Sequence, residues 1–113
     1  VDDSASVRQM VGMTLKQAGY SVVEACDGQE ALQKATSTRV DAVITDLNMP
    51  GMDGLAVLHE ARRLHENLPV IIITGFSTEA SAIEAANLGV SGYLTKPFKV
   101  LKVLSVAARA LGE

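Results

Sequence analysis

The chain has 113 residues, 48% of them hydrophobic, which is typical of one folded domain and argues against a disordered segment. The formal net charge is -3 and lysine and arginine form no dense run, so direct binding to nucleic-acid phosphates is disfavoured. No apolar run reaches the ~20 residues that a membrane-spanning helix requires. The single cysteine, Cys26, excludes an internal disulfide and is typical of a reducing cytosol.

The first half of the chain predicts two helices and two strands. A helical pattern over residues 5–18 stops at Gly19, because glycine readily adopts the positive φ that ends a helix. Residues 20–25 are expected to form a strand. The run Asp27-Gly28-Gln29-Glu30 has the form of a capping box that opens a helix to about Thr36, and residues 40–45 predict the next strand.

The second half continues the alternation. A helix is expected from Asp53 or Gly54 to about residue 65, followed by a strand over residues 69–74. That strand is β-branched without interruption, which favours burial on both faces. Ser77 or Thr78 caps a helix that ends before Gly89, a strand follows over residues 92–95, and the last helix covers residues 98–111. Strand-helix alternation with short connections predicts an α/β fold with a parallel sheet covered by helices.

The start of the chain departs from this pattern. Val1-Asp2-Asp3 precedes the first helix with no strand before it. A strand-helix unit here needs several apolar residues upstream of Asp2. We therefore expect the first strand to be largely missing from this chain.

Polar side chains follow the ends of the expected strands. Asp2 and Asp3 stand where the first strand would end, and the later strands end at Asp46, Thr74 and Lys96. Ligands of such sheets bind at the carboxyl ends of the strands, and converging carboxylates repel one another unless a cation is bound. Oxygen ligands of this kind suit Mg²⁺ (or Mn²⁺), while a hydroxyl and an ammonium suit a phosphoryl group. The pattern predicts a carboxylate that becomes phosphorylated beside a divalent cation.

Four motifs resemble the receiver domain of bacterial two-component response regulators. They are Asp2-Asp3-Ser4, the run from Asp46-Leu47-Asn48-Met49-Pro50 to Gly54, Thr74-Gly75, and Gly92-Tyr93-Leu94-Thr95-Lys96-Pro97-Phe98. The resemblance runs from end to end and implies a single receiver domain over residues 1–113 of a bacterial cytoplasmic protein. It also implies a flavodoxin-like doubly wound sheet of five parallel strands in the order 2-1-3-4-5, with five helices. The missing first strand would then be the central one, between the strands through Val22 and Val43.

The resemblance also assigns roles to individual residues. Asp46 would accept a phosphoryl group from a histidine kinase or phosphotransfer protein. Asp3, Asp46 and the backbone carbonyl of Asn48 would ligate Mg²⁺, and Asp2 would act through a bound water. Lys96 would contact the phosphoryl group, Thr74 would be drawn towards it, and Tyr93 would rotate inward on activation. The chain would catalyse only its own phosphorylation and dephosphorylation.

Two further expectations concern the rim of this site. By the resemblance, Asn48 and Phe76 flank the path of the water that hydrolyses the acyl phosphate. A bulky apolar Phe76 would hinder that water, which predicts a longer-lived phosphorylated state. The Lys96-Pro97 bond is expected to be cis, because the lysine must turn back into the crevice while the chain leaves for the last helix.

The last helix suggests a partner surface. One stripe is expected to face the core and comprises Leu101, Leu104, Ala108 and Leu111. A second apolar group, Val103, Val106 and Ala110, lies well round from it and is interpreted as a contact patch for a homodimer or a target protein.

Three alternatives stay open. A phosphatase of the aspartyl-phosphate class needs a second carboxylate two residues beyond its nucleophile, where this chain has Asn48. A flavodoxin needs a hydroxyl-rich phosphate loop after the first strand, where Asp2 and Asp3 would repel phosphate. The chain also fits the receiver portion of a longer regulator with a DNA-binding or enzymatic output domain.

Overall fold

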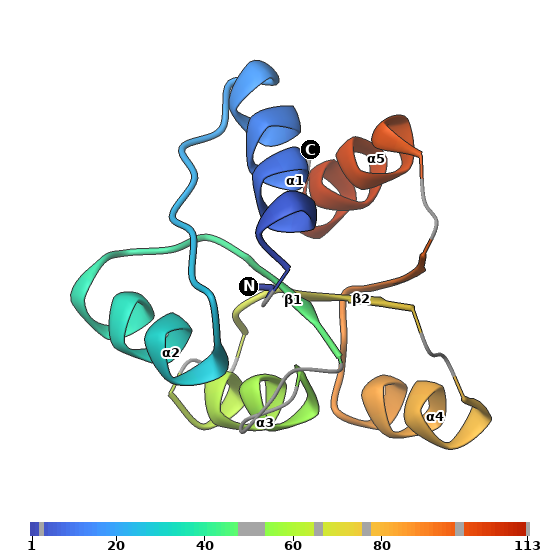
Figure 1. Cartoon of the computed structure of the whole chain (residues 1–113). Coiled ribbons are helices and arrows are strands. Elements are labelled where there is room, and N and C mark those ends of the chain that lie inside the picture. Colours follow the sequence, from blue (N-terminus) through green and yellow to red (C-terminus); the bar gives the residue numbers. More distant parts are fainter. Residues whose placement is uncertain (3, 48–53, 65–66, 76–77, 97–98, 113) are drawn as a thin grey trace.

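The computed structural model describes residues 1–2, 4–47, 54–64, 67–75, 78–96 and 99–112. Within these residues the chain forms five helices and three strands, and helices and strands alternate from α2 onwards (Figure 1). The helices are α1 (Ala5–Gln17), α2 (Gly28–Ser37), α3 (Gly54–Leu64), α4 (Glu79–Asn87) and α5 (Val100–Ala110). The strands are β1 (Val43–Asp46), β2 (Val70–Thr74) and β3 (Gly92–Thr95).

The three strands form one parallel sheet in the order β1-β2-β3. In Figure 1, α1 and α5 lie on one side of the sheet, and α2, α3 and α4 lie on the other. The central strand β2 is buried along its whole length, as its unbroken β-branched run predicts. The α/β fold with a parallel sheet between helices is therefore confirmed.

Side chains of β2 alternate between two cores. Val70 and Ile72 pack with Leu58 of α3 on one face, whereas Ile71 and Ile73 pack with α5 on the other. This follows from the two-residue period of a strand, which sends successive side chains to opposite faces. Each face of the sheet therefore has its own apolar layer.

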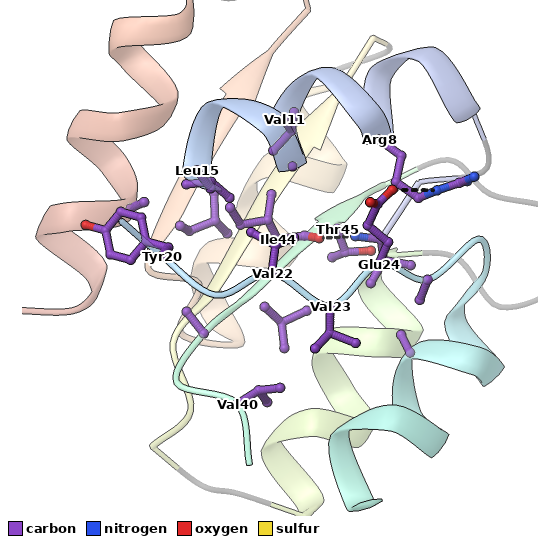
Figure 2. Close-up of a pocket in the computed structure, with 18 of the residues that line it drawn as sticks. Arg8, Val11, Leu15, Tyr20, Val22, Val23, Glu24, Val40, Ile44 and Thr45 are labelled. Carbon is purple, nitrogen blue, oxygen red and sulfur yellow. Dashed lines mark hydrogen bonds and ion pairs between the residues drawn. The ribbon is translucent and has the colours of Figure 1, made fainter. Parts of the chain in front are cut away.

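Residues 20–25 do not form the strand that their sequence predicts. The backbone of this segment adopts no regular secondary structure. A cavity of about 510 Å³ lies against it, and the cavity lining includes Val22 on this segment and Ile44 on β1 (Figure 2). A strand needs a neighbour that supplies backbone hydrogen bonds, and this segment faces a cavity where the expected first strand would be. That strand stays a prediction.

The predicted contact patch on the last helix is wrong. Val103 and Val106 are only 2% and 9% exposed, and with Ala110 they pack against the core around Ile71 and Ile73. Leu101, expected in the core, is 76% exposed. Two apolar stripes of α5 fit the helical period, and the stripe that contains Val103 and Val106 is the one that packs against the sheet.

Gly92 makes this packing possible, because a Cβ at Gly92 would collide with Cγ1 of Val106. The side-chain-free position on β3 therefore lets α5 approach the sheet closely.

The predicted helix caps are present, but the capping box expected at Asp27 is incomplete. The Asp27 carboxylate accepts a hydrogen bond from Glu30 N at 2.8 Å, as a cap should. The Glu30 side chain instead pairs with Lys34 at 2.8 Å and accepts the Cys26 thiol at 3.1 Å. The complete capping box is at α4, between Thr78 and Ser81.

Gly54 allows the start of α3 to lie against the end of β1. A Cβ at Gly54 would collide with the Asp46 carbonyl oxygen and lie 2.7 Å from Leu47 Cα, both of them backbone atoms. Backbone cannot move aside as a flexible side chain can. We expect Gly54→Ala to lower the free energy of unfolding by about 2 kcal/mol, measured by urea denaturation.

Gly12→Ala is the matched control. Gly12 is also a buried helical glycine, but the nearest atoms to its added Cβ are 3.6 Å away. This change should raise stability by up to about 1 kcal/mol, because alanine is the better helix former. Equal effects at the two glycines would show that the contact with β1 is unimportant.

The amino group of Val1 predicts a pH dependence for a chain that begins at this residue. Burial lowers the pKa of the Val1 ammonium from 8.0 to about 6. The unfolded chain then binds more protons between these two values, so the free energy of unfolding rises from pH 6 to pH 8. The full change corresponds to roughly 2 to 3 kcal/mol. Urea denaturation at a series of pH values measures it, and an acetylated terminus should abolish the rise.

Candidate functional site

Parallel strands bring the predicted polar residues to one edge of the sheet. Asp46 is the last residue of β1, Thr74 is the last residue of β2, and Lys96 follows the last residue of β3. The Lys96 Nζ lies 3.2 Å from Asp46 Oδ2 and 3.4 Å from Asp2 Oδ2. One ammonium thus joins two carboxylates that are far apart in the sequence.

Both carboxylates are nearly enclosed by protein. Asp2 is 5% exposed and Asp46 is 6% exposed. Asp2 Oδ1 also accepts a hydrogen bond from Ser4 N at 2.8 Å. Buried carboxylates are stable when they are paired and hydrogen-bonded, which is the case here.

Backbone hydrogen bonds hold these residues in position. Asp46 N donates to Val1 O at 2.8 Å, which places the chain entering Asp2 beside the end of β1. Lys96 N donates to Thr74 O at 2.7 Å, which continues the pairing of β3 with β2. The site is therefore built on the sheet edge and its geometry is set by the strand register.

The two carboxylates dominate the electrostatics of Lys96. Partial burial by itself would lower the pKa of the Lys96 ammonium. The charges of Asp2 and Asp46, with their hydrogen bonds, outweigh this and raise the pKa above its usual value. Two carboxylates against one ammonium leave an excess negative charge, which favours a second cation at this edge.

Several predicted site residues lie outside the described residues. They are Asp3, Asn48, Phe76 and the Lys96-Pro97 bond. Their predicted roles are therefore untested. Among the residues that are described, no group of three His, Cys, Asp or Glu side chains is arranged to hold a metal ion.

The predicted switch residues lie in neighbouring strands. Thr74 is fully buried, and Tyr93 is half-buried against the core on the α3 side of the sheet. The Tyr93 hydroxyl is 3.5 Å from Ser81 Oγ, the hydroxyl that completes the capping box of α4. Tyr93 therefore sits next to the start of that helix.

Three residues of this region were missed from the sequence. Arg8 donates from Nη1 to Asp2 O at 2.8 Å and pairs through Nε with Glu24 at 3.4 Å, as Figure 2 shows for the ion pair. Gly54 was seen only as a helix start, and Ser81 only as a helix residue. The position of Arg8 one turn into a helix that begins beside Asp2 was a usable signal, because its side chain can reach back to the helix start.

Residues 1–108 match the family model described as the response regulator receiver domain. The chain belongs to this family. The solved chemotaxis protein CheY4 of Vibrio cholerae is 39% identical, with a TM-score of 0.92 over 97% of this chain and 93% of that one. The receiver domain of NtrX from Brucella abortus is 33% identical, with a TM-score of 0.92 over 98% and 94% of the two chains.

Two curated relatives are much longer proteins. The DNA-binding transcriptional regulator NtrC of Klebsiella pneumoniae is 38% identical over 113 residues, which are 100% of this chain and 24% of NtrC. The transcriptional regulatory protein PrrA of Mycobacterium leprae is 37% identical over 98% of this chain and 47% of that protein. This chain thus spans about a quarter to a half of these regulators.

Membership of the family decides between the alternative folds and activities. The chain is a receiver domain of two-component response regulators, and not a flavodoxin or an aspartyl-phosphate phosphatase. Receiver domains generally bind Mg²⁺ at their phosphorylation site and interact with histidine kinases and output domains. Along the described part of the chain, no helix combines the length and apolarity needed to cross a membrane.

Proposed function

We propose that this receiver domain is a phosphorylation-controlled switch in which Asp46 accepts the phosphoryl group of a histidine kinase or phosphotransfer protein. The observation that supports this assignment is the ammonium of Lys96 shared by the carboxylates of Asp46 and Asp2 at the carboxyl edge of the sheet. Of these two carboxylates, Asp46 is the better candidate for the acceptor because it ends strand β1. The neighbouring strand β2 ends in the buried Thr74.

In the proposed reaction an oxygen of Asp46 attacks the phosphorus of a phosphohistidine. A phosphorus-oxygen bond forms, the phosphorus-nitrogen bond breaks, and the departing imidazole takes up a proton. Lys96 is within 3.2 Å of the Asp46 carboxylate, so its ammonium can turn to an oxygen of the new acyl phosphate with little movement. Hydrolysis returns phosphate and the free carboxylate, so the domain acts as catalyst only on itself.

The donor set fits a divalent cation. Asp2 and Asp46 supply buried carboxylate oxygens that already converge on a positive charge. Asp3, Asp46 and the Asn48 carbonyl would hold Mg²⁺ directly, with Asp2 acting through a water. The ion would neutralise charge on the transferred group. Asn48 and Phe76 would set the phosphoryl lifetime by controlling access of water.

The output of the switch would pass from Thr74 to Tyr93. Thr74 would move towards the phosphoryl oxygen, and Tyr93 would turn into the space that it leaves. Tyr93 lies on the neighbouring strand β3 with its hydroxyl near Ser81, so this turn would also alter the start of α4.

The domain is proposed to work in the bacterial cytoplasm, since Cys26 is its lone cysteine. The output is either a separate target protein or another domain of a longer regulator. The span of 24% of NtrC supports the second arrangement, with a DNA-binding or enzymatic output domain.

Labelling with a small phosphodonor tests the acceptor. After incubation with acetyl phosphate and Mg²⁺, borohydride trapping and mass spectrometry should place the adduct on Asp46. Asp46→Asn should reduce labelling at least about tenfold, since the amide is not a nucleophile. Asp3→Asn should weaken Mg²⁺ binding in a calorimetric titration more than Asp2→Asn does.

Asp41→Asn is the matched control, because Asp41 is an exposed aspartate that pairs with Arg39 at the surface. It should label and bind Mg²⁺ like the parent chain. Full labelling of Asp46→Asn, or an adduct on another residue, would contradict the assignment.

The Tyr93 switch is tested with beryllofluoride, which mimics the bound phosphoryl group. The ring signals of Tyr93 in NMR spectra should shift on beryllofluoride binding, because the ring changes its surroundings. In Thr74→Ala they should not shift, although the variant should still accept phosphate. Tyr20 is the other of two tyrosines and serves as an internal reference. Unchanged Tyr93 signals in the parent chain would exclude the proposed coupling.

A further inference from the structure

Arg8 of α1 turns its guanidinium back towards the start of the helix, where Asp2 stands. Its Nη1 donates a hydrogen bond to the Asp2 carbonyl oxygen at 2.8 Å. Its Nε lies 3.4 Å from Glu24 Oε1 in an ion pair that Figure 2 shows. The Arg8 side chain is 21% exposed, so this cation is largely withdrawn from water. A positive charge beside a site that favours a cation calls for a role other than its charge, because like charges repel.

The contacts of Arg8 close a ring that contains the main chain of Asp2. Asp2 N donates to Ala25 O at 3.2 Å, and Glu24 directly precedes Ala25. Glu24 is itself held by α2, since Lys34 Nζ donates to its carbonyl oxygen. The Asp2 main chain is therefore held at both of its polar groups, by Ala25 at the N–H and by Arg8 at the carbonyl oxygen.

The Glu24 carboxylate lies along α1. Oε1 pairs with Arg8, and Oε2 is 3.6 Å from the position that a Cβ would take at Gly12, one turn further along the helix. The helix therefore presents the charge of Arg8 and the bare backbone of Gly12 to the same carboxylate. Because Glu24 offsets the charge of Arg8, the hydrogen bond to Asp2 adds little net positive charge near the site.

The hold on the main chain also orients the Asp2 side chain. Oδ1 accepts from Ser4 N at 2.8 Å, and Oδ2 lies 3.4 Å from Lys96 Nζ. With its N–H, its carbonyl oxygen and both carboxylate oxygens engaged, Asp2 is fixed in one orientation. A carboxylate that is already oriented binds a metal or its bound water better, because ordering it during binding would cost conformational entropy.

We propose that Arg8, neutralised by Glu24, is a positioning residue for the cation site at the carboxyl edge of the sheet. It holds the main chain of Asp2 so that the Asp2 carboxylate is aimed at a divalent cation or at a water bound to that cation. Its action is geometric and does not depend on its charge. This inference rests on the cation site of the proposed function.

The direction of the effect on Mg²⁺ binding separates position from charge. If Arg8 acted through its charge alone, removal of the charge would tighten the binding of a nearby cation. If Arg8 positions Asp2, its removal weakens that binding. Residues that orient metal ligands typically change metal affinity by about ten- to a hundredfold.

Calorimetric titration of the whole chain with Mg²⁺ tests the proposal. Arg8→Met keeps the apolar stem but removes the donors and the charge, and it should lower Mg²⁺ affinity at least about tenfold. Arg8→Lys keeps the charge and can still donate to Asp2 O, so its affinity should lie between those of Arg8→Met and the parent chain. Arg39→Met is the matched control, because Arg39 is 93% exposed and pairs with Asp41 at the surface. It should bind Mg²⁺ like the parent chain.

Hydrogen exchange gives a second measurement that needs no metal. In the absence of Mg²⁺, the amides of Asp2 and Ser4 should exchange at least about tenfold faster in Arg8→Met than in the parent chain, whereas Arg39→Met should leave them unchanged. Glu24→Gln should weaken Mg²⁺ binding less than Arg8→Met does. Combined with Arg8→Met it should cause no further loss, because Glu24 acts through Arg8.

The outcomes distinguish this inference from the proposed function. Mg²⁺ binding by Arg8→Met that equals or exceeds that of the parent chain would overturn the positioning role and leave the proposed function intact. Unchanged exchange of the Asp2 and Ser4 amides in Arg8→Met would also overturn it. An additive loss in the double variant would refute the role given to Glu24. A parent chain that binds no Mg²⁺ would overturn the cation site itself, and this inference with it.

Discussion

The burial of two carboxylates beside one ammonium is the interaction on which the site depends. Asp2 and Asp46 carry charge in places where water hardly reaches, so each needs a positive partner. Lys96 supplies that partner to both, and the carboxylates in turn keep Lys96 charged by raising its pKa. Because one negative charge remains uncompensated, the same arrangement favours a further cation at this edge of the sheet. The proposed phosphorylation of Asp46 would depend on this imbalance, because a bound cation would neutralise charge on the transferred group.

The parallel sheet makes this arrangement possible. In a parallel ladder all strands end at the same edge, so residues that follow successive strands meet although they are far apart in the sequence. Asp46 pairs in register with Ile73, and Thr74 pairs with Thr95, so the proposed acceptor Asp46, the Thr74 hydroxyl and Lys96 lie at the ends of neighbouring strands. Gly54 then lets α3 close over the end of β1 without displacing the Asp46 backbone. The lack of a side chain at Gly54 therefore keeps the backbone of Asp46, the proposed acceptor, in place.

The same edge connects the site with the cavity. Val1 pairs with β1 through backbone bonds, and Asp2 follows it directly with a bond to Ala25. The stability of the sheet and the geometry of the carboxylates are therefore linked through two residues. Arg8 strengthens this link, because it contacts the Asp2 carbonyl oxygen and the Glu24 carboxylate on the far side of the cavity.

The sequence by itself determined the alternation of elements, the burial of β2, the helix caps at Asp27 and Thr78, and the meeting of Asp2, Asp46 and Lys96 at one edge. These features depend on local periodicity, on cap chemistry and on the rule that parallel strands end together. The tertiary structure alone decided which stripe of α5 is buried, because both stripes were apolar and only contact with Gly92 and β2 distinguishes them. It also decided that residues 20–25 form no strand in this chain, since β-branched residues supply propensity but a strand exists only with a hydrogen-bonded neighbour.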